Sequence, residues 1–174
     1  MQALEFWKAV VDDSVDFLDD LIALLDRLDV RYCVIGGQGV NAYVEPLVSL
    51  DLDLVVAADQ IETVATAASE RFRVERFEHS LNISSPGSNL RVQVQLDPRY
   101  FDFPSEAVRR DVLGVSLPVA SVADVLRGKV WAAQDSTRRP TKRRKDLLDI
   151  ERLVEAYPEL GSGLPEDIKT KLEY

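Results

Sequence analysis

The pattern of apolar and polar positions predicts a mixed α/β domain that begins with a long helix. Within residues 4–28, apolar side chains recur at helical spacing, which is typical of a helix with one buried face. Residues 31–35 form a short apolar run, whereas residues 50–56 and 90–96 alternate apolar and polar side chains. Both patterns are typical of β-strands. We therefore expect a sheet that is preceded by a helix.

The rest of the pattern predicts shorter strands and two closing helices. Strands are expected at 73–77, 81–84 and within 112–119, and helices at 36–43, 59–71, 121–134 and 142–157. Ser121 is placed to cap the first closing helix, because its side-chain oxygen can accept a hydrogen bond from a free amide. Prolines and glycines follow the second closing helix. We therefore expect a single domain over residues 1–160 and a poorly packed C-terminal tail over residues 161–174.

Composition and charge are those of a globular chain with an acidic balance. The 174 residues are 46% hydrophobic and 29% charged, and the formal net charge is -9. A general nucleic-acid coat protein would be basic, so any nucleic-acid contact must be local. Cys33 is the single cysteine, which excludes an intrachain disulfide and a cysteine-cluster zinc site. Without a secretory pattern or an apolar run of membrane-spanning length, we expect a cytoplasmic protein that does not enter a membrane.

Charge is distributed unevenly along the chain. Residues 138–145 contain six basic side chains and no acidic one: Arg138, Arg139, Lys142, Arg143, Arg144 and Lys145. A solvated helix face is the common explanation of such a run, and a phosphate-bearing partner such as tRNA or another RNA is the alternative. Residues 1–30 are rich in acidic side chains. The helix expected over residues 4–28 is therefore a candidate surface for a basic protein partner.

The strand at 50–56 contains two carboxylates, Asp51 and Asp53, although carboxylates are disfavoured in strands. At this spacing they share one face, about 7 Å apart at the α-carbons, and can bind one divalent cation or bridge two. Gly36 and Gly37 end the preceding strand, where backbone amides can approach a phosphate. An edge strand or a tight turn would explain either feature alone. Together they indicate a phosphate site beside a metal-binding pair.

The run VIGGQGVNAYVEPLVSLDLDLVV resembles the opening of the DNA polymerase beta-like nucleotidyltransferase superfamily, and it is most similar to the AbiEii-like (abortive infection) nucleotidyltransferase toxins. The shared pattern is matched by Gly36, Gly37, Asn41, Ala42, Tyr43, Ser49, Asp51 and Asp53. The segments GKVWA and KRRKDLLDIERL also resemble that branch, through Lys129, Lys145, Asp146, Asp149 and Ile150. The resemblance spans residues 30–155.

This resemblance implies a nucleotidyltransferase-like mixed central sheet flanked by helices, with two C-terminal closing helices. It also implies transfer of a nucleoside monophosphate from an NTP to a hydroxyl or phosphate acceptor, which could be RNA, a protein or a small molecule. An antitoxin protein is a further candidate partner. The implied nucleotide-binding residues are Gly36, Gly37, Ser49, Lys129 and Lys145. The implied catalytic residues are Asp51, Asp53, Lys129 and Asp146, of which Asp51 and Asp53 would hold Mg²⁺ or Mn²⁺. A surface lysine and a helix-face ion pair are open alternatives for Lys129 and Asp146.

One position departs from the family pattern. Active members of the superfamily have a third carboxylate on a later central strand, whereas the polar face of residues 90–96 presents Arg91, Gln93 and Gln95. Glutamine replaces the acid, and Gln93 is the expected position. Asp97, at the end of the strand, is the competing candidate. The sequence is therefore compatible with a slow metal-dependent enzyme and with a non-catalytic nucleotide- or RNA-binding protein.

Overall fold

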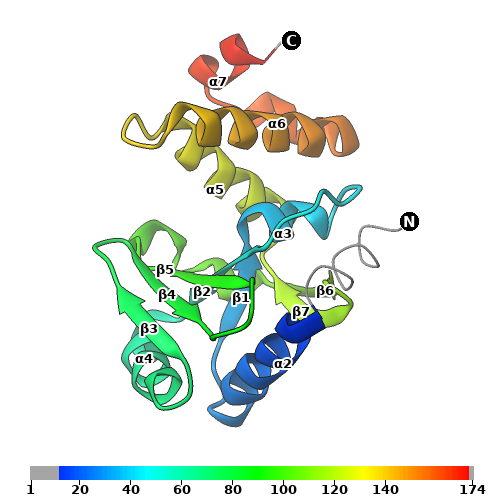
Figure 1. Cartoon of the computed structure of the whole chain (residues 1–174). Helices are drawn as coiled ribbons and strands as arrows, with labels where there is room; N and C mark the ends of the chain where they lie inside the picture. Colours follow the sequence, from blue (N-terminus) through cyan, green and yellow to red (C-terminus); the bar gives the residue numbers. More distant parts are fainter. Residues whose placement is uncertain (1–11, 173–174) are drawn as a thin grey trace.

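The computed structural model describes residues 12–172, so residues 4–11 of the expected first helix lie outside the described part. Within this part the strands form one seven-stranded sheet in the order β3-β4-β5-β2-β1-β7-β6 (Figure 1). The strands are β1 (Tyr32–Ile35), β2 (Asp51–Val56), β3 (Arg73–Arg76), β4 (Ser80–Ser84), β5 (Arg91–Gln95), β6 (Val108–Val112) and β7 (Val115–Val119). The mixed α/β class expected from the sequence is confirmed.

The centre of the sheet combines parallel and antiparallel pairs. β1 pairs with β2 antiparallel and with β7 parallel, and β2 pairs with β5 parallel. β4 pairs antiparallel with both β3 and β5, and β6 with β7. The register places Asp53 between Ile35 of β1 and Gln93 of β5. Because residues in register share a face of the sheet, Asp53 and Gln93 lie side by side.

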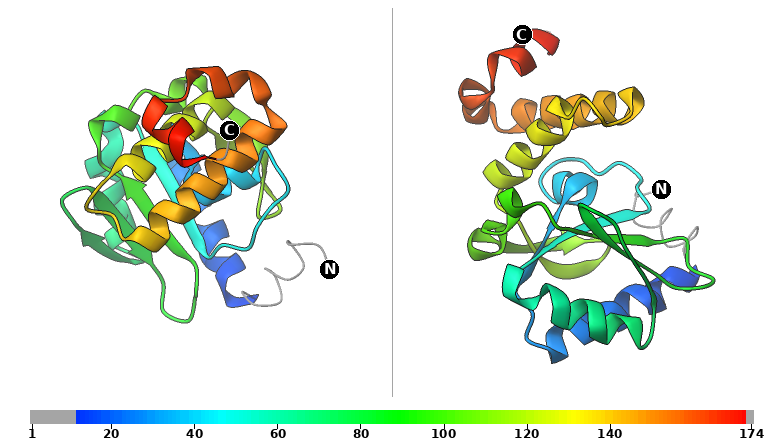
Figure 2. Two further views of the ribbon diagram at one scale, coloured as in Figure 1. Left: turned by 90° about the horizontal axis from the view of Figure 1, so that it is seen from above. Right: turned by 90° about the vertical axis from the view of Figure 1, so that its left-hand side faces the viewer.

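Helices cover both faces of the sheet (Figures 1 and 2). They are α2 (Asp12–Arg27), α3 (Gly36–Asn41), α4 (Ile61–Ser69), α5 (Val122–Gln134), α6 (Pro140–Ala156) and α7 (Glu166–Lys171), with short 3₁₀ helices η1 (Ala58–Gln60), η2 (Pro98–Tyr100), η3 (Phe103–Glu106) and η4 (Pro158–Gly163). α2 and α4 lie on one face, and α3, α5 and α6 on the other. The Ser121 hydroxyl accepts a hydrogen bond from the Asp124 amide, which confirms the predicted cap of α5.

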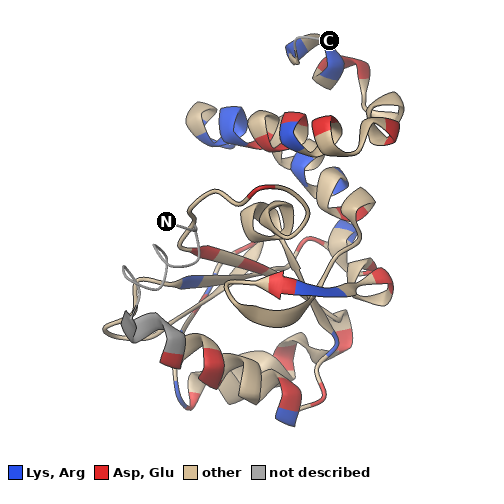
Figure 3. Cartoon of the chain, turned by 90° about the vertical axis from the view of Figure 1, so that its right-hand side faces the viewer, with Lys and Arg blue, Asp and Glu red and all other residues tan. Residues whose placement is uncertain are grey.

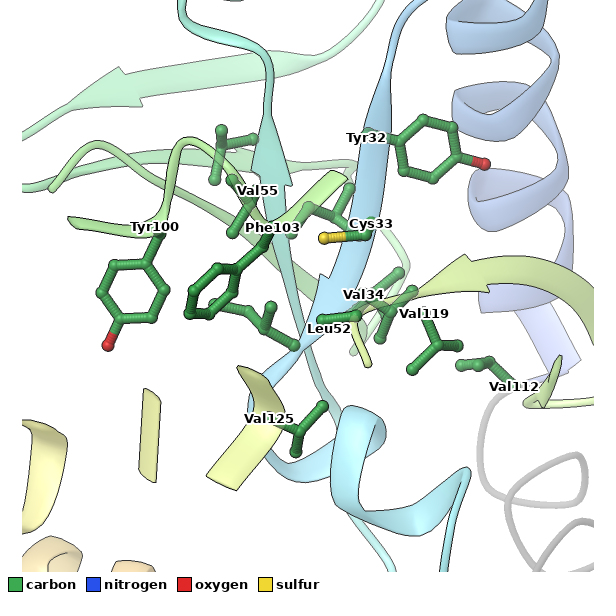
Figure 4. Packing of buried hydrophobic residues seen from close by; sticks show 14 of the residues in the cluster. Tyr32, Cys33, Val34, Leu52, Val55, Tyr100, Phe103, Val112, Val119 and Val125 are labelled. Carbon is green, nitrogen blue, oxygen red and sulfur yellow. The ribbon is translucent and has the colours of Figure 1, made fainter. Parts of the chain in front are cut away.

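The hydrophobic core continues across the sheet into the aromatic segment after β5. Leu52 and Leu54 of β2 are buried together with the apolar face of α2. On the other face Phe103 lies against the β1–β2 pair (Figure 4), and it stacks on Trp131 of α5 at a centroid distance of 5.9 Å. Tyr100 makes edge contacts with both rings. These three aromatic side chains thus pack against one another between the sheet and α5.

The expectation of a poorly packed segment after residue 160 is wrong for residues 161–172. Leu164, Ile168 and Leu172 have exposed fractions of 6%, 0% and 3%, and α7 contacts α5. Gln134 of α5 also donates hydrogen bonds to Asp167. Ile168 lies within α7, whereas Leu164 precedes this helix and Leu172 follows it directly. The preceding prolines and glycines therefore mark a turn between packed helices. No helix in residues 12–172 is long and apolar enough to cross a membrane.

Replacing Ile168 with Ala should lower the free energy of unfolding by about 2–4 kcal/mol, because the truncation leaves a cavity at a fully buried position. Urea denaturation followed by circular dichroism measures the change. The exposed neighbour Thr170 provides the control, and Thr170→Ala should change stability by about 0.5 kcal/mol or less. Equal stabilities of the two variants would contradict the packing of α7.

Candidate active site

Asp51 and Asp53 project from β2 into a cavity of about 260 Å³ that Gly36 and Gln93 also line. Gly36 has φ +65°, a left-handed conformation that residues with a side chain rarely adopt. A Cβ atom at this position would overlap the Asp53 carboxylate. The glycine thus allows the backbone at the start of α3 to lie directly against the second carboxylate of the pair.

Three of the predicted nucleotide-binding residues gather beside this cavity. A Cβ atom on Gly37 would lie 3.9 Å from both the Lys145 ammonium and the Ser49 hydroxyl. The Ser49 hydroxyl also accepts a hydrogen bond from the Asp51 amide at 3.3 Å, so it is tied to the start of β2. The structure brings Gly37, Ser49 and Lys145 together, and their contact with nucleotide remains a prediction.

Lys129 and Asp146 also reach the cavity, where they belong to a buried ion-pair network between α5 and α6. The Lys129 ammonium lies 3.1 Å from Asp146 Oδ1 and 2.8 Å from Asp149 Oδ2. Arg138 Nε contacts the other Asp146 oxygen at 2.7 Å, and Arg152 contacts Asp149 at 2.8 Å. Three cations thus compensate two carboxylates. The expectation that Lys129 could be an ordinary surface lysine is wrong, because the side chain is almost completely buried.

The same network extends to the segment between α3 and β2. Arg152 donates hydrogen bonds to the Asn41 side chain and to the Glu45 carbonyl oxygen. Asn41 in turn accepts from the Leu47 amide and donates to the Leu47 carbonyl oxygen. Gln38 of α3 donates to the Ser49 carbonyl oxygen at 3.0 Å. The side chains of α3 and α6 therefore set the course of residues 45–49, which end at the predicted nucleotide-binding serine.

The electrostatic environment of Asp53 differs from that of an exposed carboxylate. Burial raises the pKa of the Asp53 carboxyl group above its ordinary value, and this effect exceeds the opposing effect of the Lys129 ammonium. The neighbouring carboxylate Asp51 raises the pKa further, whereas Arg138 and Lys142 lower it. In the free protein a negative charge on Asp53 is therefore unfavourable, and a bound cation would stabilise it.

The position expected for a third carboxylate is occupied by glutamine. Gln93 lies in register with Asp53 and lines the same cavity, as does Gln95. The competing candidate, Asp97, does not line this cavity. Its carboxylate caps η2 and pairs with Arg99 at 2.8 Å, so the expectation that it joins the cluster is wrong. The turn at Pro98 and the guanidinium of Arg99 hold it at the end of the sheet.

Several residues of the cavity were not predicted as site residues from the sequence. Lys142 lines the cavity from α6, and Arg138 lines it from the loop before this helix. Tyr100 lines it from η2. Lysine and arginine positions are concentrated in the first turns of α6 (Figure 3). The basic run had identified Arg138 and Lys142 as candidates for RNA contact, and the cavity shows that these two also face Asp51 and Asp53. Tyr100 had no sequence signal beyond its aromatic ring.

The oxygen donors of the cavity fit a hard divalent cation. Asp51 and Asp53 provide carboxylate oxygens, and Gln93 beside them provides an amide oxygen. Within residues 12–172, no group of three or more His, Cys, Asp or Glu residues is placed to hold a metal ion. A cation at this pair would therefore need further ligands from outside the protein, such as phosphate oxygens.

Solved structures with a similar fold are nucleotidyltransferases. The solution structure of the antibiotic-resistance factor ANT(2'')-Ia is 12% identical, with 87% of this chain and 95% of that chain covered and a TM-score of 0.57. The lincosamide antibiotic adenylyltransferase LnuA, solved with lincomycin bound, is 12% identical, with 78% and 95% covered and a TM-score of 0.53. An antigenic nucleotidyltransferase-like protein from Paracoccidioides brasiliensis is 17% identical, with 78% and 73% covered and a TM-score of 0.51.

This chain shares the fold of these proteins, and its Asp51–Asp53 pair lies in one cavity with Gly36. The family model described as nucleotidyl transferase AbiEii toxin, type IV toxin–antitoxin system, matches residues 43–174. The chain belongs to this AbiEii family, which confirms the resemblance found in the sequence. A comparison with curated proteins found no matching relative.

Replacing Gly36 with Ala should lower the free energy of unfolding by more than about 1 kcal/mol, because a side chain at φ +65° is strained and overlaps Asp53. Gly163 is a matched control, since a Cβ atom there would meet nothing within 4 Å. Gly163→Ala should leave stability unchanged or slightly raised. Urea denaturation measures the free energy of unfolding of both variants. A similar loss of stability in both would contradict a specific requirement for glycine at position 36.

Asp53→Asn should raise the melting temperature of the metal-free protein at neutral pH, because the charged form of a carboxyl with a raised pKa opposes folding. A change of 1 kcal/mol corresponds to about 2–4 °C in a chain of this size. The gain should shrink as pH falls through the folded-state pKa and vanish below pH ~3, where the carboxyl group is protonated in both states. Calorimetry across this range tests the prediction. A pH-independent gain, or an equal gain in the exposed control Asp102→Asn, would contradict it.

Proposed function

We propose that this protein is a metal-dependent nucleotidyltransferase that moves a nucleoside monophosphate from an NTP to a hydroxyl group of an RNA acceptor. The observation that supports the proposal most directly is the pair Asp51 and Asp53 in one cavity with Gly36, Lys142 and Arg138. Carboxylates that hold a cation, and basic groups that face them, match the needs of a triphosphate.

In this proposal, Asp51 and Asp53 hold Mg²⁺ or Mn²⁺, which would stabilise the negative charge of the triphosphate and of the departing pyrophosphate. Gly36, Gly37 and Ser49 position the phosphates, with Lys145 beside Gly37. Lys129 keeps Asp146 and the first turns of α6 over the cavity. The acceptor oxygen forms a bond to the α-phosphorus, and the bond from that phosphorus to the bridging oxygen breaks. Pyrophosphate leaves with the electron pair.

The hydroxyl proton of the acceptor needs a destination, and Gln93 cannot accept it as a carboxylate would. We propose that it passes to water, so that transfer is slower than in an enzyme with three carboxylates. The same glutamine favours a second candidate function, a non-catalytic nucleotide- or RNA-binding protein. The two candidates differ in one observable: whether label from NTP becomes covalently attached to an acceptor.

An RNA acceptor and a toxin role follow from different observations. Basic residues are concentrated in the first turns of α6 (Figure 3), and one of them, Lys142, lines the cavity, so they offer phosphate contacts there. The family is described as a toxin of type IV toxin–antitoxin systems, and we propose that this chain acts as such a toxin component with an antitoxin partner. Its acidic α2 remains a candidate surface for that partner.

The test is incubation with each α-³²P-labelled NTP, Mg²⁺ or Mn²⁺, and total RNA. Labelled RNA is expected, and Asp51→Asn or Asp53→Asn should lower the rate by about two orders of magnitude, because the cation loses a charged ligand. The exposed Asp102→Asn is the control and should keep the wild-type rate. Metal-dependent NTP binding without any labelled product would favour the non-catalytic candidate. Unchanged rates in both active-site variants would refute the assignment of the site.

A further inference from the structure

Apolar side chains are exposed on two neighbouring segments, the loop before β2 and the outer face of α6. Leu47 and Val48 of the loop are 46% and 53% exposed, and Leu148 of α6 is 46% exposed. The other large apolar residues exposed among residues 12–172, Phe77 and Val108, lie at the turn after β3 and at the start of β6. Single exposed apolar residues are common, whereas several together often mark an interface.

Contacts at both ends hold the loop alongside α6, and it runs beneath the last turns of this helix (Figure 1). At one end, Arg152 donates a hydrogen bond to the Glu45 carbonyl oxygen. At the other end, the Lys145 ammonium and the Ser49 hydroxyl each lie 3.9 Å from a Cβ atom placed on the second glycine of α3. Leu148 is three residues from Lys145 and four from Arg152, on the same side of the helix. It therefore lies level with the two exposed apolar residues of the loop.

A groove of about 490 Å³ adjoins these apolar residues at the last turns of α6. Its lining is partly apolar and partly charged: Val44, Pro46, Leu47 and Ala156, with Glu45, Glu155 and Arg152. The Arg152 guanidinium is paired with Asp149 at 2.8 Å, whereas the carboxylates of Glu45 and Glu155 have no ion-pair partner among residues 12–172. Apolar walls with two unpaired carboxylates fit the methylene stem and the charged end of an arginine or lysine side chain.

The same face of α6 carries such a side chain toward its other end. Arg144 is exposed, and it has no ion-pair partner in the described part of the chain. It lies four residues before Leu148, and Glu155 lies seven residues after Leu148, so the three share the outer face of the helix. A basic, an apolar and an acidic group thus follow one another along about 16 Å of helix. Figure 3 shows basic positions at the start of α6 and an acidic position near its end.

A face with this order of groups is complementary to itself. When two copies meet across a two-fold axis near Leu148, the basic end of each lies over the acidic end of the other, and the apolar residues meet at the axis. We propose that this protein forms a symmetric dimer through the outer face of α6 and the loop before β2. Arg144 of each copy enters the groove of the other, where its guanidinium meets Glu45 and Glu155.

This interface leaves the basic lining of the active-site cavity free. Arg138 and Lys142 line that cavity, and Arg144, two residues after Lys142, lies on the nearly opposite side of the helix. The dimer would hold the loop that ends at Ser49 without covering the cavity. Self-association needs neither nucleotide nor metal, so it does not depend on the proposed function.

Sedimentation velocity of the full chain at about 1–100 µM, which resolves a dissociation constant in the micromolar range, tests the dimer. Arg144→Glu and Glu155→Arg should each raise this constant by about tenfold or more, because like charges replace two opposite-charge contacts. Leu148→Asp, at the axis, should raise it as well. Glu78→Arg, in the exposed turn between β3 and β4, is the control. It changes the net charge as Glu155→Arg does and should leave the dimer intact.

A mixture of the two charge-reversed variants gives the sharpest result. The Arg144→Glu chain keeps Glu155, and the Glu155→Arg chain keeps Arg144, so a mixed dimer contains one native contact and one contact of reversed charge. The mixture should dimerise about tenfold more tightly than either variant alone. A wild-type protein that stays monomeric to about 100 µM would overturn the proposal and leave the surface for a different protein. A dimer that both variants retain, or a mixture no tighter than its components, would overturn it too.

Discussion

The burial of the Lys129 ammonium between Asp146 and Asp149 is the interaction on which the active-site cavity depends. A buried charge is costly unless it is paired and hydrogen-bonded, and each carboxylate here has a second cationic partner, Arg138 or Arg152. These contacts join α5 to α6 at one place. They thereby determine where the first turns of α6 and their basic side chains lie relative to β2.

The network also gives a structural role to an asparagine that the family pattern contains. Asn41 holds the backbone of Leu47 through two hydrogen bonds, and Arg152 joins it to Asp149. The loop before β2 is thus connected to the same charges that fix the closing helices. Because a lost partner in such a network leaves another group unpaired, the loop and the helices are structurally linked.

The site combines two demands that oppose one another. Asp51 and Asp53 must lie close together to hold a cation, yet their proximity and burial disfavour the charge on Asp53. A third carboxylate in place of Gln93 would add a negative charge beside Asp53. Glutamine therefore favours the stability of the metal-free protein, while it weakens the attraction for a cation and removes a proton acceptor.

The sequence alone determined the features that depend on short-range patterns: the strand with both aspartates on one face, the glycines at the start of α3 and the cap at Ser121. It also indicated Gln93 in place of the third carboxylate. Only the tertiary structure decided that β2 lies between β1 and β5, that Lys129 is buried between two carboxylates, and that Ile168 packs into the core. These contacts join residues far apart in the chain. Local apolar and polar patterns do not specify which distant side chains meet, because that depends on how all the elements pack together.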